Sequence, residues 1–420
     1  MFLLLNILGI FAFLGIGALA SRERKMIPWK NVGVLLVCEV VLAWFLTTFS
    51  VGREGIRIVV EVFSSLLHSA YAGIRFAVPD WVNVPQMNFL TAALLPILFV
   101  VPLFDILNYI GVLPFIVRWC GKALAKISHA ARFESFFAIE MMFLGNTEAI
   151  GVSRVQLKRM KAERNLAIAM MSMSCISVAM LGVYSVMMPA DLVLTAVPLN
   201  AMSALLAIQL LNPTKVPPEE DIIYEVQEKG KEEPFFSFLS DSILGAGKIV
   251  LIIFANVVAF VALEDFFNVL LGTLVAGLSL ETIFGYFMLP FAWLLGLQAD
   301  EAFLVAQYMG EKLVTNEIVV MLSVKDHLSE YSTHAVAVMT LFVTSFANFS
   351  TLGMVLGCAK GIMDEESNLL IGRNVWRIFV SGIWRERALA PERRSAKYVL
   401  RRRGPFSRRS SRACGCGRTG

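Results

Sequence analysis

Two glutamates, Glu148 and Glu317, are the residues of this chain whose type and setting most clearly indicate chemistry. Each follows an amide in a short polar string, Gly145-Asn146-Thr147-Glu148 and Thr315-Asn316-Glu317, and each string interrupts an otherwise apolar stretch. A carboxylate at the centre of a bilayer costs about 2.5–3.5 kcal/mol on insertion scales, so an intramembrane glutamate marks a functional site. Two such strings in matching contexts predict a binding site near the middle of a membrane protein built from two repeats.

The polar groups expected at this depth are hydrogen-bonding partners for a neutral ligand. They are Asn146, Thr147, Glu148, Glu317 and Asn348. Carboxylates accept hydrogen bonds, whereas amides both donate and accept, so the set suits a ribose that carries a heterocyclic base. An anion fits poorly because two carboxylates would repel it. A buried carboxylate can also bind a proton, which makes Glu148 and Glu317 candidates for a coupling proton. The alternative is that each glutamate only pairs with a helix dipole or with Lys312.

The composition places these residues in a membrane. Hydrophobic residues make up 57% of the 420-residue chain, above the roughly 45–50% of soluble domains. Stretches apolar enough to enter a bilayer occupy residues 1–20, 31–50, 88–112, 165–188, 191–211, 248–271 and 334–359. We therefore expect an all-α polytopic membrane protein with about eight transmembrane helices.

The two polar strings predict re-entrant hairpins rather than simple spans. Residues 133–153 and 300–323 are apolar but are interrupted by the strings that contain Glu148 and Glu317. Such a break is tolerated only where it is buried in protein or lines a cavity. If each hairpin enters and leaves on one side, the two halves are inverted relative to each other.

The distribution of positive charge supports this topology. Before residue 384 there are 25 Lys and Arg, of which 20 fall on the expected cytoplasmic side and four outside, while Lys312 lies within a hairpin. Cytoplasmic loops carry the excess of Lys and Arg, so the N-terminus is expected outside and the chain in the inner (cytoplasmic) membrane. Residues 113–132 have the charge spacing of a basic amphipathic helix at the cytoplasmic face.

The last 37 residues differ in character from the rest. Residues 384–420 carry 11 Arg and one Lys against two Glu, a net charge of +10, so the first 383 residues carry −6. So many arginines cannot enter hydrocarbon cheaply. Two interpretations stay open: a basic tail held at anionic lipid headgroups, or an altered reading frame, which the absence of a helical apolar period favours. In either case the last spanning helix is expected to be truncated.

Motifs of other function classes are missing from the sequence. There is no HExxH or other metal motif, no P-loop and no paired zinc-type cysteines. We therefore expect no metal, no cofactor, no nucleic-acid partner and no enzymatic activity.

Three strings resemble those of the concentrative nucleoside transporters. They are Phe143-Leu144-Gly145-Asn146-Thr147-Glu148, Lys312-Leu313-Val314-Thr315-Asn316-Glu317 and Ser345-Phe346-Ala347-Asn348-Phe349-Ser350-Thr351, and the resemblance covers about residues 1–380. It implies a homotrimer whose protomers combine a scaffold with a transport domain that moves like an elevator. It also implies secondary active import of nucleosides. A gated channel, or a membrane-bound recognition module without active transport, is the alternative.

The resemblance also implies roles for individual residues. Asn146, Thr147 and Glu148 would bind the base, with Asn146 in place of the family's longer Gln, and Met180 would line it. Glu317, Asn348 and Thr351 would bind the ribose, and Phe346 would pack against the nucleoside. Sodium-coupled members have oxygen ligands where this chain has Met141 and Cys175-Ile176. Sulfur is a poor ligand for a hard cation, so proton coupling is expected, with Glu148 or Glu317 as the carrier.

With this resemblance the chain divides into six segments. They are N-terminal helices, mostly scaffold, at 1–132; a first transport repeat at 133–211; a cytoplasmic linker and interfacial segment at 212–247; a scaffold helix and external segment at 248–299; a second transport repeat at 300–383, with a helix at 334–359 and a partial last helix at 374–383; and the Arg-rich tail at 384–420.

Overall fold

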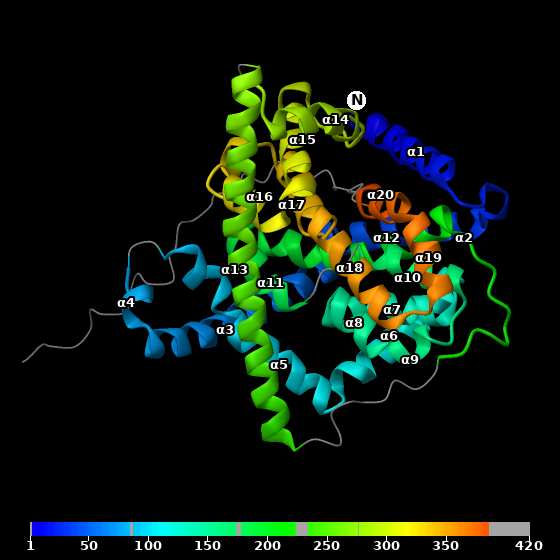
Figure 1. The fold of residues 1–420 in the computed structure, drawn as a ribbon, viewed down its shortest axis with the longest axis horizontal. Helices are drawn as coiled ribbons and strands as arrows, with labels where there is room; N and C mark the ends of the chain where they lie inside the picture. The colour runs from blue at the N-terminus through cyan, green and yellow to red at the C-terminus, as the bar shows by residue number, and fades with distance from the viewer. Residues whose placement is uncertain (1, 85–86, 174–177, 224–233, 276, 386–420) are drawn as a thin grey trace, which may run out of the picture.

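The structure, a computed structural model, describes residues 2–84, 87–173, 178–223, 234–275 and 277–385. Every regular element in these ranges is helical (Figure 1). The expected all-α membrane fold is confirmed. Residues 386–420, which hold most of the Arg-rich tail, lie outside the described residues.

The N-terminal part ends in a helix that carries regularly spaced basic residues. Its helices are α1 (Phe2–Ala20), α2 (Trp29–Thr47), α3 (Ser50–Ala77), α4 (Pro79–Val82), the π-helical turn η2 (Leu90–Leu94), α5 (Ile97–Tyr109) and α6 (Val112–Ser128), with the short 3-10 turn η1 (Arg24–Met26) between α1 and α2. Arg118, Lys122 and Lys126 recur every fourth residue along α6, as expected for a basic amphipathic helix. The helix ends earlier than predicted, because His129 adopts a left-handed conformation with φ 51°.

The first repeat contains a hairpin and two further membrane segments. It comprises α7 (Arg132–Leu144), α8 (Asn146–Val152), α9 (Arg154–Leu157), α10 (Ala162–Ser172), α11 (Val178–Met187) and α12 (Ala190–Leu211). The hairpin turns at Gly145, whose φ of +87° is strained for any residue with a Cβ. The expected hairpin at 133–153 is therefore present, with its tip at the predicted string.

The second repeat has the same order of elements. After α13 (Phe235–Leu274) and α14 (Leu280–Leu294) come α15 (Ala299–Val314), α16 (Glu317–Val324), the short η3 (Leu328–Glu330), α17 (Thr333–Val343), α18 (Phe349–Ile362), α19 (Glu365–Arg373) and α20 (Val375–Arg385). Helices α15 and α16 form the second hairpin, and they meet at Thr315-Asn316.

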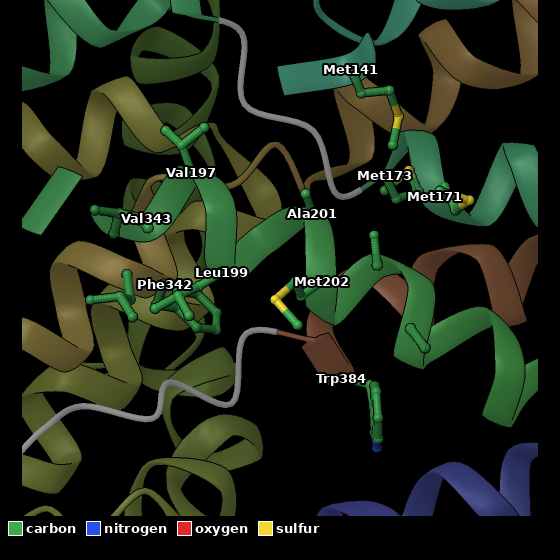
Figure 2. Packing of buried hydrophobic residues seen from close by; sticks show 14 of the residues in the cluster. Met141, Met171, Met173, Val197, Leu199, Ala201, Met202, Phe342, Val343 and Trp384 are labelled. Atoms are coloured by element: carbon green, nitrogen blue, oxygen red, sulfur yellow. The ribbon is translucent and has the colours of Figure 1, made fainter. Parts of the chain in front are cut away.

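Helix α12 lies at the centre of the buried core. All its residues except Ala190, Asp191 and Pro198 are buried. Met202 and Leu199 of this helix lie among side chains from α17 and α20, including Phe342 and Trp384 (Figure 2). The Ser203 hydroxyl donates to the carboxylate of Glu39 on α2, which explains one acidic residue inside an apolar span.

Among the described residues, four helical segments are long and apolar enough to span a bilayer. They are Trp29–Thr47, Leu90–Tyr109, Ala190–Leu211 and Phe235–Leu274. Shorter apolar helices include Thr333–Val343 and Phe349–Ile362, which are separated by the unwound residues 344–348. Helix α13 is 40 residues long and mostly exposed along its apolar length, and it runs the height of the molecule in Figure 1.

Three element bounds differ from those expected. The single helix expected at 334–359 is two half-helices, α17 and α18, with residues 344–348 unwound between them. The interfacial segment expected up to residue 247 is already part of α13 from Phe235 onward. The last helix continues to Arg385 instead of ending at 383. Trp384 is buried there, because its indole N–H donates to the carbonyl of Phe13 on α1.

The linker after α12 is fixed to the first hairpin instead of being free in solvent. Arg164 of α10 donates from Nε and Nη2 to the two carboxylate oxygens of Glu134 on α7, at 2.8 and 2.7 Å. Its third contact goes from Nη1 to the carbonyl of Glu220 in the linker, at 2.9 Å. Gln156 donates to the carbonyl of Ile222 at 3.0 Å. One buried arginine thus joins the hairpin, α10 and the linker.

Candidate functional site

Glu317 is held at the start of α16 by the residue that precedes it. Asn316 caps this helix, and its Oδ1 accepts from the backbone N–H groups of Ile318 and Val319, both at 3.0 Å. The carboxylate of Glu317 is therefore in the first turn of a helix, where the helix dipole stabilises negative charge. Only 5% of the residue is exposed. The polar string found in the sequence is thus an N-cap followed by a buried acid.

The unwound segment 344–348 brings a second helix start to the same place. Asn348 caps α18 by accepting from the N–H of Thr351 at 2.8 Å, and its Nδ2 donates to Glu317 Oε2 at 3.0 Å. Lys312, which is fully buried, donates to the carbonyl of Phe342 and to the hydroxyl of Ser345, both at 2.7 Å. Lys312 stabilises the break and also acts electrostatically on Glu317.

Tyr184 is a site residue that the sequence analysis missed. It lies on α11 in the first repeat, is fully buried, and donates from its hydroxyl to Glu317 Oε1 at 3.0 Å. Each oxygen of the Glu317 carboxylate therefore has a donor, one from each half of the chain. A tyrosine within an apolar helix cannot be recognised as a site residue from the sequence. Only the tertiary fold shows that Tyr184 faces the carboxylate of Glu317.

The first hairpin presents its polar residues differently. Asn146 is 5% exposed, and its amide donates to the carbonyl of Ser172 at the end of α10, at 3.4 Å. Thr147 lies in the first turn of α8, and its side chain is outside the described part of the structure. Glu148, which was expected to be buried, is exposed.

The remaining predicted residues lie on the α11 and α18 side. Met180 is buried on α11, and Thr351 is buried in the first turn of α18. Phe346 is half-buried within the unwound segment. Asn348 and Thr351 therefore lie at the start of α18, where Asn348 contacts Glu317, and Phe346 lies in the unwound segment before them.

Glu148 lines a cavity of about 1500 Å³. The cavity lies between α6, α7, α8 and the linker at 218–223, and basic side chains of α6 contribute to its wall: Arg118, Lys122 and Lys126. These residues are on the side expected to face the cytoplasm. Ile362, at the end of α18, also lines this cavity.

The two glutamates of the sequence analysis have different surroundings in the structure. The charge of Glu148 acts on the thiol of Cys358, which lies ten residues beyond Asn348 and hence about 15 Å further along α18. Glu317 is therefore at the start of α18, while Glu148 faces the cavity beside its second half.

Met141, at a position where sodium-coupled relatives are expected to have an oxygen ligand, is 2% exposed. Figure 2 shows its thioether on the same side of the core as Met171 and Met173, and all three belong to one buried cluster. Cys175 and Ile176, the other two positions, lie outside the described residues.

Two hairpins, a helix broken at residues 344–348 and a buried polar site at that break are the features of a membrane transporter built from repeats. Comparison with known proteins gives the family. Residues 8–81 match the model described as Na+ dependent nucleoside transporter N-terminus, and residues 192–387 match the corresponding C-terminus. The chain belongs to this family, the concentrative nucleoside transporters, and is therefore a nucleoside transporter of the multi-pass membrane type rather than an enzyme.

Individual relatives extend over almost the whole chain. The purine nucleoside transport protein NupG of Bacillus subtilis is 45% identical over 383 residues, which cover 91% of this chain and 96% of the relative. The putative nucleoside permease NupX of Escherichia coli is 28% identical, covering 86% and 91%. The solved structure of CNTnw in an inward-facing substrate-bound state has a TM-score of 0.85 at 22% identity, covering 92% and 96%.

Proposed function

We propose that this chain is a secondary active transporter that imports purine nucleosides across the cytoplasmic membrane together with protons. The observation that carries the proposal is the Glu317 carboxylate, which is held between Tyr184 and Asn348 where the two repeats meet. A buried carboxylate whose two oxygens are already held in position can accept hydrogen bonds from two adjacent hydroxyls, such as the 2′ and 3′ hydroxyls of a ribose.

The base is assigned to the first hairpin and α11. In this proposal Asn146, Thr147 and Glu148 bind the edge of the base, and Met180 lines it, as the family resemblance implies. The ribose is assigned to Glu317 together with Asn348 and Thr351, and Phe346 packs against the nucleoside. The preference for purines rests on the similarity to the Bacillus subtilis relative, whose name describes it as a purine nucleoside transport protein.

Proton coupling is supported by the chemistry of the Met141 position. A buried thioether among other thioethers offers no hard oxygen to sodium. The family's description names Na+, so the coupling ion is the part of the proposal that most needs a test. The sequence analysis made Glu148 and Glu317 the candidate proton carriers, because both are carboxylates within the transport repeats.

The assembly and topology are proposed from the fold. The apolar length of α13 is mostly exposed, which suits contact with lipid and with two further copies in a trimer. The transport repeats would move against this scaffold as an elevator, and the N-terminus would lie outside.

Uptake in a bacterial strain that lacks nucleoside transport tests the substrate class. Cells that express the chain should accumulate radiolabelled inosine and guanosine above the external concentration, and uridine should compete poorly. The Glu317→Gln variant should express at the wild-type level and lose uptake. The amide has only one oxygen, so it cannot accept hydrogen bonds from both ribose hydroxyls. Equilibration without accumulation would instead indicate a channel, and strong competition by uridine would contradict the purine preference.

Reconstitution into liposomes tests the coupling ion. An imposed pH gradient, acidic outside, should drive inosine accumulation at equal sodium on both sides. Accumulation that follows an imposed sodium gradient at equal pH would contradict proton coupling.

A further inference from the structure

We propose that Glu140, in the first limb of the first hairpin, carries the coupling proton. This inference rests on the proposed function and replaces Glu148 and Glu317 in that role. Glu140 lies on α7, a little more than one turn before the tip at Gly145. Ser153, which follows the second limb, donates from its hydroxyl to Glu140 Oε2 at 2.9 Å.

The Glu140 carboxylate is buried with little to compensate its charge. The residue is 4% exposed, and within the described part of the chain its one polar contact is the hydroxyl of Ser153. A carboxylate moved out of water loses several kcal/mol of hydration, which attraction to a cation offsets only with good geometry. A single neutral donor does not do this, so Glu140 is stable in the hairpin when it holds a proton.

Other acids near the transport path have compensation that Glu140 lacks. Glu134, six residues earlier on α7, is paired through both oxygens with Arg164. Glu317 has two donors, a helix N-terminus and the charge of Lys312. Glu148 is exposed to the cavity and keeps its hydration. Each of these three thus has a cation, several donors or water beside its carboxylate, whereas Glu140 has one hydroxyl.

The elements packed against α7 carry further titratable groups. The elements packed against α7 bring Lys122 and Arg118 from α6, Glu148 from α8, Arg164 from α10, Tyr184 from α11 and Asp191 from α12, and Arg154 of α9 lines the same cavity. Among the described residues no ion pair joins any of them to Glu140. Arg164 is already engaged by Glu134, and the α6 cations lie along the wall of the cavity that Glu140 also lines.

That cavity supplies a path for the proton. Glu140 and Glu148 both line it, on the side expected to face the cytoplasm. The carboxylate would take a proton from water on the outer side and return it to water through this cavity after the hairpin has moved. In this proposal protonation of Glu140 raises the affinity for the nucleoside, and by linkage the nucleoside raises the affinity for the proton by the same factor.

The second hairpin contains a related contact that serves as a comparison. Ser323 of its second limb donates to Glu311 of its first limb at 3.4 Å. Glu311 faces the charge of Glu281 and is absent from the wall of the large cavity. The geometry therefore assigns the proton to the first hairpin.

The test uses full-length protein in liposomes and two assays of inosine movement. Counterflow exchange at equal pH needs nucleoside binding but no net proton movement, whereas accumulation under a pH gradient needs both. In Glu140→Gln, gradient-driven accumulation should fall at least about tenfold and lose its pH dependence, while counterflow persists. Glu311→Gln should behave as the wild type in both assays, and so should Glu163→Gln, which changes a half-buried glutamate paired with Arg22 at 3.5 Å.

A second variant keeps the inference testable if Glu140→Gln does not fold. Ser153→Ala removes the donor that stabilises the charged form, so the pH dependence of uptake should move to higher pH. Normal accumulation by Glu140→Gln, an unchanged pH profile in Ser153→Ala, or loss of coupling in Glu311→Gln alone would each overturn the assignment. If the pH gradient does not drive inosine accumulation by the wild-type protein, the proposed proton symport is refuted, and the role of Glu140 with it.

Discussion

At the scale of single residues, the geometry of the site depends on the groups that donate hydrogen bonds to the Glu317 carboxylate. Its two oxygens receive a phenol from α11 and an amide from the start of α18, each at 3.0 Å. Hydrogen bonds to charged groups are worth about 1.5–3 kcal/mol each. Losing one leaves the carboxylate free to rotate away from the geometry that a ribose needs.

Replacing Tyr184 by Phe isolates this effect. The ring stays in the core, but Glu317 loses one donor, so the KM for inosine uptake should rise about tenfold, which corresponds to about 1.4 kcal/mol. Tyr331→Phe is the matched control, because in the described part of the chain the hydroxyl of Tyr331 donates to that of Tyr308, at 3.5 Å, in a partly exposed loop. An unchanged KM in Tyr184→Phe would mean that the phenol does not position the site.

At the scale of elements, the same residues begin helices and build the site. Asn316 and Asn348 cap α16 and α18, which is why an unwound segment can persist in a membrane. The break at 344–348 exposes backbone groups that Lys312 and the caps satisfy.

The two roles of Asn348 can be separated by substitution. Serine is as good an N-cap as asparagine but cannot donate an amide to Glu317, so Asn348→Ser should keep the melting temperature and lose nucleoside affinity. Asp364→Ala removes the cap of α19, remote from the site, and should lower stability by about 1 kcal/mol without changing KM. Equal effects of both variants on stability and KM would contradict this separation.

The buried pair of Arg164 and Glu134 anchors the first hairpin to α10. Removing one partner of a buried pair costs about 3–5 kcal/mol, while replacing both by apolar residues is often neutral. Arg164→Met alone should therefore lower the melting temperature in detergent strongly, and adding Glu134→Met should restore most of the loss. Additive losses would show that the two residues act independently.

At the scale of the whole molecule, the chain's topology decides where its loops lie. The linker after α12 is expected in the cytoplasm and the loop after the second hairpin outside. In a variant without native cysteines, Asp326→Cys should react with an impermeant maleimide added to intact cells, and Lys215→Cys should react only after lysis. Both positions are exposed, so the pair differs mainly in its side of the membrane. The reverse pattern would invert the topology.

Much of this architecture could be predicted from the order of apolar and polar residues. The two hairpins, their tips and the basic helix α6 follow from hydropathy, from strings such as Thr315-Asn316-Glu317 and from charge spacing. The break in 334–359 could not be predicted, because serine and asparagine in a membrane helix either pack closely or mark unwinding. The choice depends on whether a neighbour such as Lys312 satisfies the freed carbonyls.

The sequence by itself determined that two acids stand beside amides in apolar surroundings, since local composition is all that such a pattern requires. Only the tertiary structure decided what each acid does. It put Tyr184 against Glu317 from 133 residues away, left Glu148 in a cavity, and buried Glu140 with one hydroxyl. Burial and the nearest donor control a carboxylate's charge, and both are set by residues distant in the chain.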